Sequence, residues 1–159
     1  MYLEMRADDE CRAAVDALIL DAPRHPSVRL DLAALAVRRG DRATALTALA
    51  KAMSLTPDLQ DRQRAALLYE DINEYKLARQ LIDGLIKEEP QDPQLHLDLA
   101  FFAADVGDRK TALSALAEAR RLKADPDDRR RMSVLYERLN EPREAKAVLT
   151  VDSQAEKSR

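Results

Sequence analysis

The chain has 159 residues, of which 46% are apolar, 35% are charged and only 4% are aromatic. Few aromatic residues, together with abundant Ala, Leu, Arg, Asp and Glu, indicate helices rather than a sheet and exclude collagen, disulfide scaffolds and low-complexity disorder. A net charge of −3 disfavours a nucleic-acid binder, because such proteins neutralise phosphates with an excess of basic residues.

The first predicted element is the end of an earlier repeat. Arg12 to Asp21 carries the pattern of the second helix of a hairpin, and the helix that should precede it lacks most of its length. Residues 1–25 are therefore predicted to be the C-terminal part of a preceding repeat. Because a solenoid rarely begins in the middle of a repeat, we expect the chain to be a segment of a longer protein.

The rest of the chain repeats itself at an offset of 67 residues. Residues 26–55 and 93–122 share 17 identities in 30 positions, and shorter matches recur at the same offset between and after them. Since 67 is about twice 34, each unit is expected to contain a pair of shorter repeats. This places four repeats at residues 26–58, 59–92, 93–126 and 127–150. Residues 151–159 are then a polar tail or the start of a next element.

Each repeat is predicted to be a helical hairpin with a left-handed residue at its turn. Glycine adopts a left-handed backbone freely and asparagine tolerates it, so both are suited to the position that ends a helix. Aspartates that follow two of these residues can accept hydrogen bonds from the free N–H groups of the next helix. The turn residues are Gly40, Asn73, Gly107 and Asn140, and the capping aspartates are Asp41 and Asp108.

The spacing of small and large residues resembles the tetratricopeptide-repeat (TPR) family, whose 34-residue unit reads W-x₂-L-G-x₂-Y, then A-x₃-F, then P. The second repeat matches best, with Ala65-Ala66, Tyr69, Ala78, Ile82 and Pro90 at these places. The Trp place is never aromatic; the four repeats hold Arg29, Arg62, His96 and Arg129 there. The resemblance implies an all-α fold, a right-handed solenoid of stacked antiparallel helix pairs.

The sequence contains no set of residues that indicates catalysis. Two histidines, His25 and His96, and a single cysteine, Cys11, are too far apart to form a metal motif. The segments GDRATA and GDRKTA lack the second Gly and the Lys-Ser/Thr of a phosphate loop. We therefore expect a protein that is not an enzyme and that has no cofactor and no metal.

In the TPR family, the first helix of each repeat lines a concave binding groove. Carried over by position, the resemblance implies a lining of Leu30, Ala34, Val37, Arg38, Gln63, Leu67, Asp71, Leu97, Phe101, Asp105, Arg130, Val134 and Arg138. The places that hold Lys and Asn in chaperone-binding members hold Leu30, Ala34, Gln63, Arg64 and Leu67 here, which argues against a co-chaperone.

Phe101 is the most informative of these lining residues. Its neighbour Phe102 is expected to point into the hairpin, so Phe101 would point towards the groove and serve as an aromatic anchor for a partner. The alternative is that both phenylalanines belong to the core, or that Phe101 packs against an adjacent repeat.

The expected function is that of a non-catalytic scaffold that binds a protein partner, with no nucleic acid and no membrane-spanning segment. The paired 67-residue register also resembles long periplasmic repeat arrays in bacterial exopolysaccharide export proteins of the Pel and cellulose systems. That resemblance implies a periplasmic location and a polysaccharide-modifying enzyme as partner. A cytoplasmic adaptor in complex assembly or regulation and a passive solenoid spacer remain as alternatives.

Overall fold

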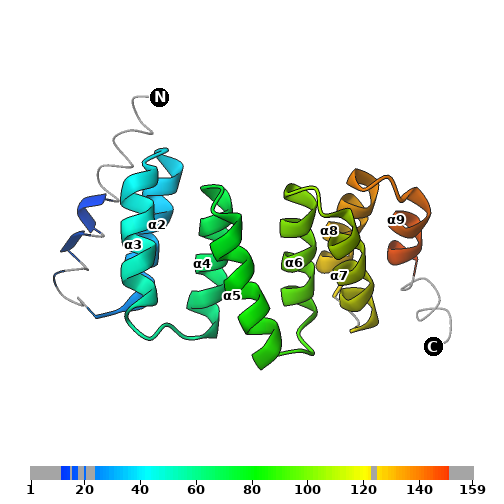
Figure 1. The fold of residues 1–159 in the computed structure, drawn as a ribbon, viewed down its shortest axis with the longest axis horizontal. Helices are drawn as coiled ribbons and strands as arrows, with labels where there is room; N and C mark the ends of the chain where they lie inside the picture. The colour runs from blue at the N-terminus through cyan, green and yellow to red at the C-terminus, as the bar shows by residue number, and fades with distance from the viewer. Residues whose placement is uncertain (1–11, 15, 18–19, 21–23, 123–124, 151–159) are drawn as a thin grey trace. The chain divides into compact units, whose positions relative to one another are not determined.

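The computed structural model describes residues 12–14, 16–17, 20, 24–122 and 125–150. The chain divides into two compact units, residues 1–81 and 82–159. Helices α2 to α9 are delimited within the described residues, where no strand occurs, and this confirms the predicted all-α class (Figure 1). The predictions for the partial repeat at residues 1–25 and for the tail at 151–159 fall largely or wholly outside the described residues.

The first unit is built on a helical hairpin, in which α2 (Pro26–Arg38) packs along α3 (Arg42–Met53). Helix α4 (Leu59–Asp71) contacts both of them, and α5 (Tyr75–Glu88) follows and contains the boundary between the units. Alanines in each of these four helices are fully buried and let the helix backbones approach; they include Ala33, Ala45, Ala66 and Ala78.

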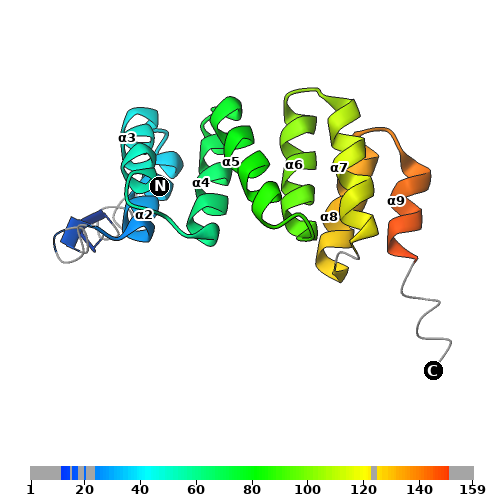
Figure 2. The ribbon, with the colours of Figure 1, turned by 60° about the horizontal axis from the view of Figure 1, so that its bottom comes forward.

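The second unit repeats this arrangement. Helix α6 (Pro93–Asp105) packs along α7 (Arg109–Arg121), and α8 (Pro126–Arg138) packs along α9 (Pro142–Leu149) and also contacts α6 and α7 (Figure 2). Its core is one cluster of small and large apolar side chains from all four helices. Buried members of the cluster include Leu97, Ala112, Leu116, Met132, Leu135, Tyr136, Ala145 and Val148.

The predicted turn residues all have a left-handed backbone. The φ angles are 70° at Gly40, 61° at Asn73, 77° at Gly107 and 59° at Asn140. The turn at Gly40 is closed by two backbone hydrogen bonds, Gly40 N–H to the Val37 carbonyl at 2.9 Å and the next N–H to the Ala36 carbonyl at 2.9 Å. These bonds satisfy carbonyl groups that the end of α2 would otherwise leave unpaired.

The predicted aspartate caps are also present. The Oδ1 atoms of Asp41 and Asp108 accept hydrogen bonds from the N–H groups of Thr44 at 3.0 Å and Thr111 at 3.1 Å. Hydrogen bonding by Thr44 lowers the pKa of Asp41, because these bonds favour the charged carboxylate. Each cap therefore fixes the start of the second helix of its hairpin.

An arginine at the start of α3 and another at the start of α7 tie their hairpins to the next one. Arg42 Nε donates to the carbonyl oxygen of Ile72 at 3.2 Å, and its guanidinium pairs with Glu74. In the second unit, Arg109 donates to the Leu139 carbonyl at 2.9 Å and to Glu141 at 2.6 Å. Since the corresponding residues of the two ties are 67 positions apart, the sequence repeat preserves the tie as well as the helices.

Candidate protein-binding surface

In each unit, the predicted lining residues occupy one side of the two first helices. Side chains three and four residues apart share a face of a helix, and α4 contacts α2 as α8 contacts α6. We call the two surfaces the α2–α4 face and the α6–α8 face; their residues are the thirteen given above, divided between the two units.

On the α2–α4 face, the structure exposes most of the predicted residues. Leu67, with 39% of its surface exposed, lies in the second half of α4. Ala34, Val37 and Gln63 are partly exposed, and Arg38 and Asp71 are exposed. The prediction is wrong for Leu30, which is fully buried, because it belongs to the apolar core of α2 and not to an accessible surface.

The α6–α8 face has the same pattern with more charge. Val134 is 64% exposed, Asp105 and Arg138 are exposed beside it, and Arg130 keeps most of its side chain in solvent. The prediction is wrong for Leu97, the counterpart of Leu30. Leu97 is fully buried because it packs in the core cluster of the second unit with residues of α7 and α8.

Phe101 combines both of the roles that its sequence position suggested. It is only partly buried, yet its ring packs against the core cluster, while Phe102 is almost completely buried. The guanidinium carbon of Arg131 lies 5.2 Å from the centre of the Phe101 ring, in the geometry of a cation–π contact. Phe101 is therefore an aromatic residue held in place by an arginine, not a free anchor.

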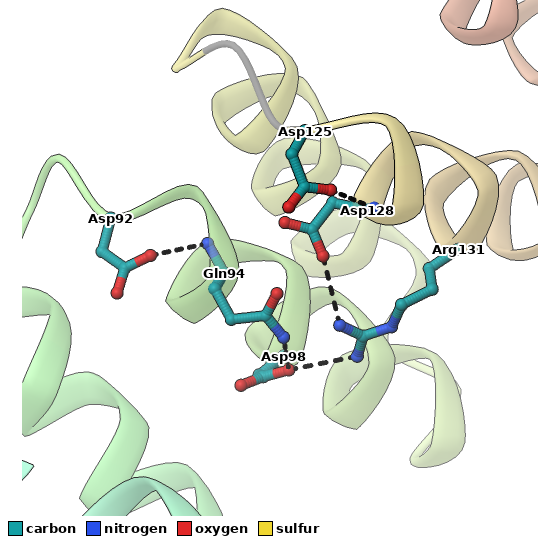
Figure 3. Close-up of polar contacts among 6 residues, drawn as sticks. All are labelled: Asp92, Gln94, Asp98, Asp125, Asp128 and Arg131. Carbon is teal, nitrogen blue, oxygen red and sulfur yellow. Dashed lines mark hydrogen bonds and ion pairs between the residues drawn. The ribbon is translucent and has the colours of Figure 1, made fainter. Parts of the chain in front are cut away.

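Arg131 is itself fixed by two carboxylates (Figure 3). Its Nη2 donates to Asp98 at 3.3 Å and its Nη1 to Asp128 at 3.4 Å. The Asp98 side chain is only 1% exposed and also accepts a hydrogen bond from Gln94 Nε2 at 3.1 Å. Burying a charge is costly unless it is paired, so this set of bonds defines where Arg131 can lie.

Helix caps surround this cluster of charges. Asp125 accepts a hydrogen bond from the Asp128 N–H at 2.8 Å, and Asp92 accepts one from the Gln94 N–H at 2.8 Å (Figure 3). Burial raises the pKa of Asp128, and the negative charges of Asp125 and Asp98 add to that increase, while Arg131 opposes it. The start of α8 is thereby attached to α6 by charged groups beside Phe101.

Charged residues border the exposed Val134 on both sides. Arg130 and Arg138 lie one helical turn before and after it on α8. Arg138 pairs with Asp105 of α6, and Arg130 pairs with Asp127 of its own helix. The α6–α8 face thus presents an apolar side chain within a charged border, which is the usual composition of a protein interface.

Arg131 was not among the residues that the sequence pattern singled out. A signal was nevertheless present in the repeat. Asp31 and Arg64 in the first unit occupy the positions of Asp98 and Arg131, and they form the equivalent ion pair at 2.6 Å. An acid and a base spaced 33 residues apart in both units are the pattern that could have identified the pair.

Two features that point to particular functions, a metal-binding cluster and a membrane-spanning helix, do not occur among the described residues. Those residues contain no group of three His, Cys, Asp or Glu side chains placed to hold a metal ion. Within the same residues, no helix is both long enough and apolar enough to cross a membrane.

A chain made of helical hairpins with small residues at their contacts and left-handed turns is a helical-repeat protein. No protein-family model and no curated protein sequence matches it. Solved structures similar to it include MamA, residues 41 to the end, from Desulfovibrio magneticus RS-1; TTC0263, a TPR protein of Thermus thermophilus; and the APC/C hetero-tetramer Cut9–Hcn1.

The similarity lies in the fold and extends over almost the whole chain. The MamA structure is 17% identical with a TM-score of 0.68, over 99% of this chain and 90% of that one. TTC0263 is 21% identical with a TM-score of 0.67, over 92% and 83%. Cut9–Hcn1 is 16% identical with a TM-score of 0.67, over 94% of this chain and 30% of that one. The chain therefore has the fold of TPR solenoids, as its sequence predicts.

Proposed function

We propose that this chain is a non-catalytic scaffold that binds a protein partner through the exposed faces of its first helices. The observation that carries the proposal is the pair Leu67 and Val134. They stand at equivalent positions, 67 residues apart, on α4 and α8, and they are 39% and 64% exposed. A large apolar side chain exposed at the same place in both units is costly in water and is suited to contact with another protein.

The border of each face adds specificity. On the α6–α8 face, the Asp105–Arg138 pair and Arg130 surround Val134, and Arg131 holds Phe101 beside them. Fixed charges around an apolar centre select the orientation of a partner more than they increase its affinity. An amphipathic helix or a folded surface with an apolar centre has the complementary chemistry.

The similar structures support this class of function. One of them, Cut9–Hcn1, is described as a hetero-tetramer. For this chain we propose the same general role, protein–protein interaction, without a particular assembly.

The exopolysaccharide export hypothesis is a narrower proposal that rests on the paired 67-residue register alone. With it come a periplasmic location and a polysaccharide-modifying enzyme as partner. A cytoplasmic adaptor is equally compatible with the two faces. The identity of the partner distinguishes these proposals, because it also reveals the compartment.

Affinity capture from the source organism tests the proposal. The bait is the wild-type chain beside a Leu67→Glu, Val134→Glu double variant, with Val106→Glu as the matched control. Val106 is 52% exposed at the turn after α6 and does not belong to either face. We expect one protein to be captured by the wild type and by the control but not by the double variant. In a binding titration, the purified form of that protein should bind the wild type and the control more tightly than the double variant. Equal capture by all three baits would contradict the proposal and favour a spacer.

A further inference from the structure

Each unit contains the same hollow between the two helices of its first hairpin. These helices are α2 and α3 in the first unit and α6 and α7 in the second. In the first unit it is about 410 Å³ and is lined by Arg29, Leu32, Ala43, Thr44, Thr47, Ala48 and Lys51. In the second unit it is about 480 Å³ and is lined by His96, Leu99, Lys110, Thr111, Ser114, Ala115 and Glu118. The two sets correspond residue by residue at the 67-residue offset, so the hollow is a property of the repeat.

The hollow has a simple origin in the sequence. Arg29 and His96 stand at the position where the TPR pattern has tryptophan. Neither side chain fills the volume that the indole ring of a tryptophan would occupy. The hollow lies between α2 and α3, and none of its lining residues belongs to the α2–α4 face. The hollow is therefore a separate site from the α2–α4 face, and its role does not depend on the function proposed for that face.

The hollow of the first unit has an unbalanced charge. Arg29 and Lys51 both line it, and its lining contains no carboxylate. Within the described residues, neither the guanidinium of Arg29 nor the ammonium of Lys51 has a hydrogen-bond or ion-pair partner. Arg29 is partly buried, and two cations beside one hollow repel each other, so an anion placed between them would be stabilised by both.

The hollow of the second unit is lined by charges of both signs, those of Lys110 and Glu118. His96 occupies the position that Arg29 has in the first unit, and the Nε2 atom of His96 lies 3.0 Å from the carbonyl oxygen of Pro90. Glu118 stands for Lys51 and pairs with Arg121 at 2.6 Å, which lowers the pKa of Glu118. The same cavity is thus lined by two cations and no carboxylate in one unit and by one cation, Lys110, and one carboxylate, Glu118, in the other, and the second hollow serves as an internal control.

We propose that the hollow between α2 and α3 binds a carboxylate group of a partner protein, with Arg29 and Lys51 as its ligands. A guanidinium can bind both oxygens of a carboxylate, and the ammonium adds a third donor. The floor of Leu32 and Ala48 is apolar and suits the methylene groups of a glutamate side chain.

A phosphate group is less suited to this site. Phosphate sites at helix starts use free backbone N–H groups, and the Thr44 N–H at the start of α3 is already donated to Asp41. The site therefore offers two side-chain cations and an apolar floor, which is the chemistry that recognises an acidic protein segment.

The test is a titration of the ¹⁵N-labelled chain followed by NMR. The probe is a short peptide, blocked at both ends, with two glutamates between two leucines; the glutamine version of this peptide and inorganic phosphate are the comparison ligands. We expect the glutamate peptide to shift the amide signals of Thr44 and Thr47 in a saturable way and to leave those of Thr111 and Ser114 unchanged. Lys51→Glu and Arg29→Gln should each weaken binding about tenfold, because each removes one charge-assisted contact.

Two further variants complete the test. Lys76→Glu makes the same change of net charge as Lys51→Glu at an exposed position outside the hollow, and it should bind like the wild type. A His96→Arg, Glu118→Lys variant should gain peptide-induced shifts at Thr111 and Ser114. Equal binding of the glutamine peptide, or of phosphate, or an unchanged affinity in both Lys51→Glu and Arg29→Gln, would overturn the assignment. Thermal melts confirm that each variant is folded before it is titrated.

Discussion

The guanidinium of Arg131 lies over the ring of Phe101, 5.2 Å from its centre, and this contact has no counterpart in the described part of the first unit. Arg64 occupies the equivalent position there and keeps the equivalent ion pair with Asp31, but Ala34 replaces the phenylalanine. The two units therefore share a charged attachment between their first helices, and only the second adds an aromatic ring to it. The α2–α4 and α6–α8 faces are built on one plan but offer different surfaces.

The first prediction concerns this charged attachment. Replacing Arg131 with Met keeps much of the apolar cover on Phe101 but removes the cation that pairs with Asp98, which is 1% exposed. Leaving that carboxylate without its cation should reduce the free energy of unfolding by about 1–3 kcal/mol, measured by urea denaturation. Adding Asp98→Asn to Arg131→Met should recover part of the loss. If Arg131→Met leaves the free energy of unfolding unchanged, the Asp98–Arg131 ion pair does not hold Phe101 in place.

The second prediction is a pH dependence at Asp128. Because burial raises its pKa above the ordinary value of 3.8, the ionised carboxylate destabilises the folded chain at neutral pH. That penalty disappears as the pH falls through the raised pKa, where the folded state takes up the proton. Asp128→Asn should therefore raise the melting temperature at pH 7, and the increase should shrink as the pH falls towards about 4.

The control for this pH dependence is Asp127→Asn. The Asp127 side chain is 81% exposed and is the immediate neighbour of Asp128 in the first turn of α8. Thermal melts of both variants at neutral pH and in mild acid make the comparison. The same trend in both would show that the effect comes from the net charge of the helix start and not from the burial of Asp128.

The sequence predicted the turns because their backbone requirement restricts the residue type. A left-handed residue must end each first helix, and only Gly and Asn occupy that place in the four hairpins. The burial of Leu30 and Leu97 was not predictable in the same way. The spacing of residues along a helix indicates on which side of the helix a side chain lies. Whether a large side chain at the edge of that side reaches the core depends on the neighbouring helix.

The two hollows show a further limit of sequence analysis. The sequence indicates that no aromatic residue stands at the Trp place, but an empty volume results only if no other side chain fills it. Charge balance is likewise a three-dimensional property, since Glu118 is neutralised by Arg121 whereas Lys51 has Ser54 at the corresponding position. Composition and spacing therefore identified the fold, and the structure was needed to distinguish the two sites.

The third prediction compares two glycines under the same substitution. Gly40 has a φ of 70°, where an L-residue is strained, whereas Gly84 lies inside α5 with nothing within 4 Å of an added Cβ atom. Gly40→Ala should lower the free energy of unfolding by about 1 kcal/mol because of that strain. Gly84→Ala should raise it by about 0.5–1 kcal/mol, because alanine restricts the unfolded chain and favours the helix. Urea denaturation of the two variants checks the opposite signs; a loss at Gly84 would mean that the added methyl group disturbs the packing of α5.

The last prediction concerns a strained position for which the sequence offers no signal. Thr56, between α3 and α4, has a φ of 55°, although β-branched residues strongly disfavour the left-handed region. Its hydroxyl donates to the preceding carbonyl of Leu55 at 2.6 Å, a local bond that an asparagine side chain can replace. Since asparagine tolerates a left-handed backbone, Thr56→Asn should raise the free energy of unfolding by about 0.5–1 kcal/mol. The matched control is Thr47→Asn, within α3, where the backbone is helical and asparagine should bring no such gain, because its helix propensity is no better than that of threonine. A destabilised Thr56→Asn variant in the same denaturation experiment would show that the hydroxyl bond, and not the backbone strain, dominates at this turn.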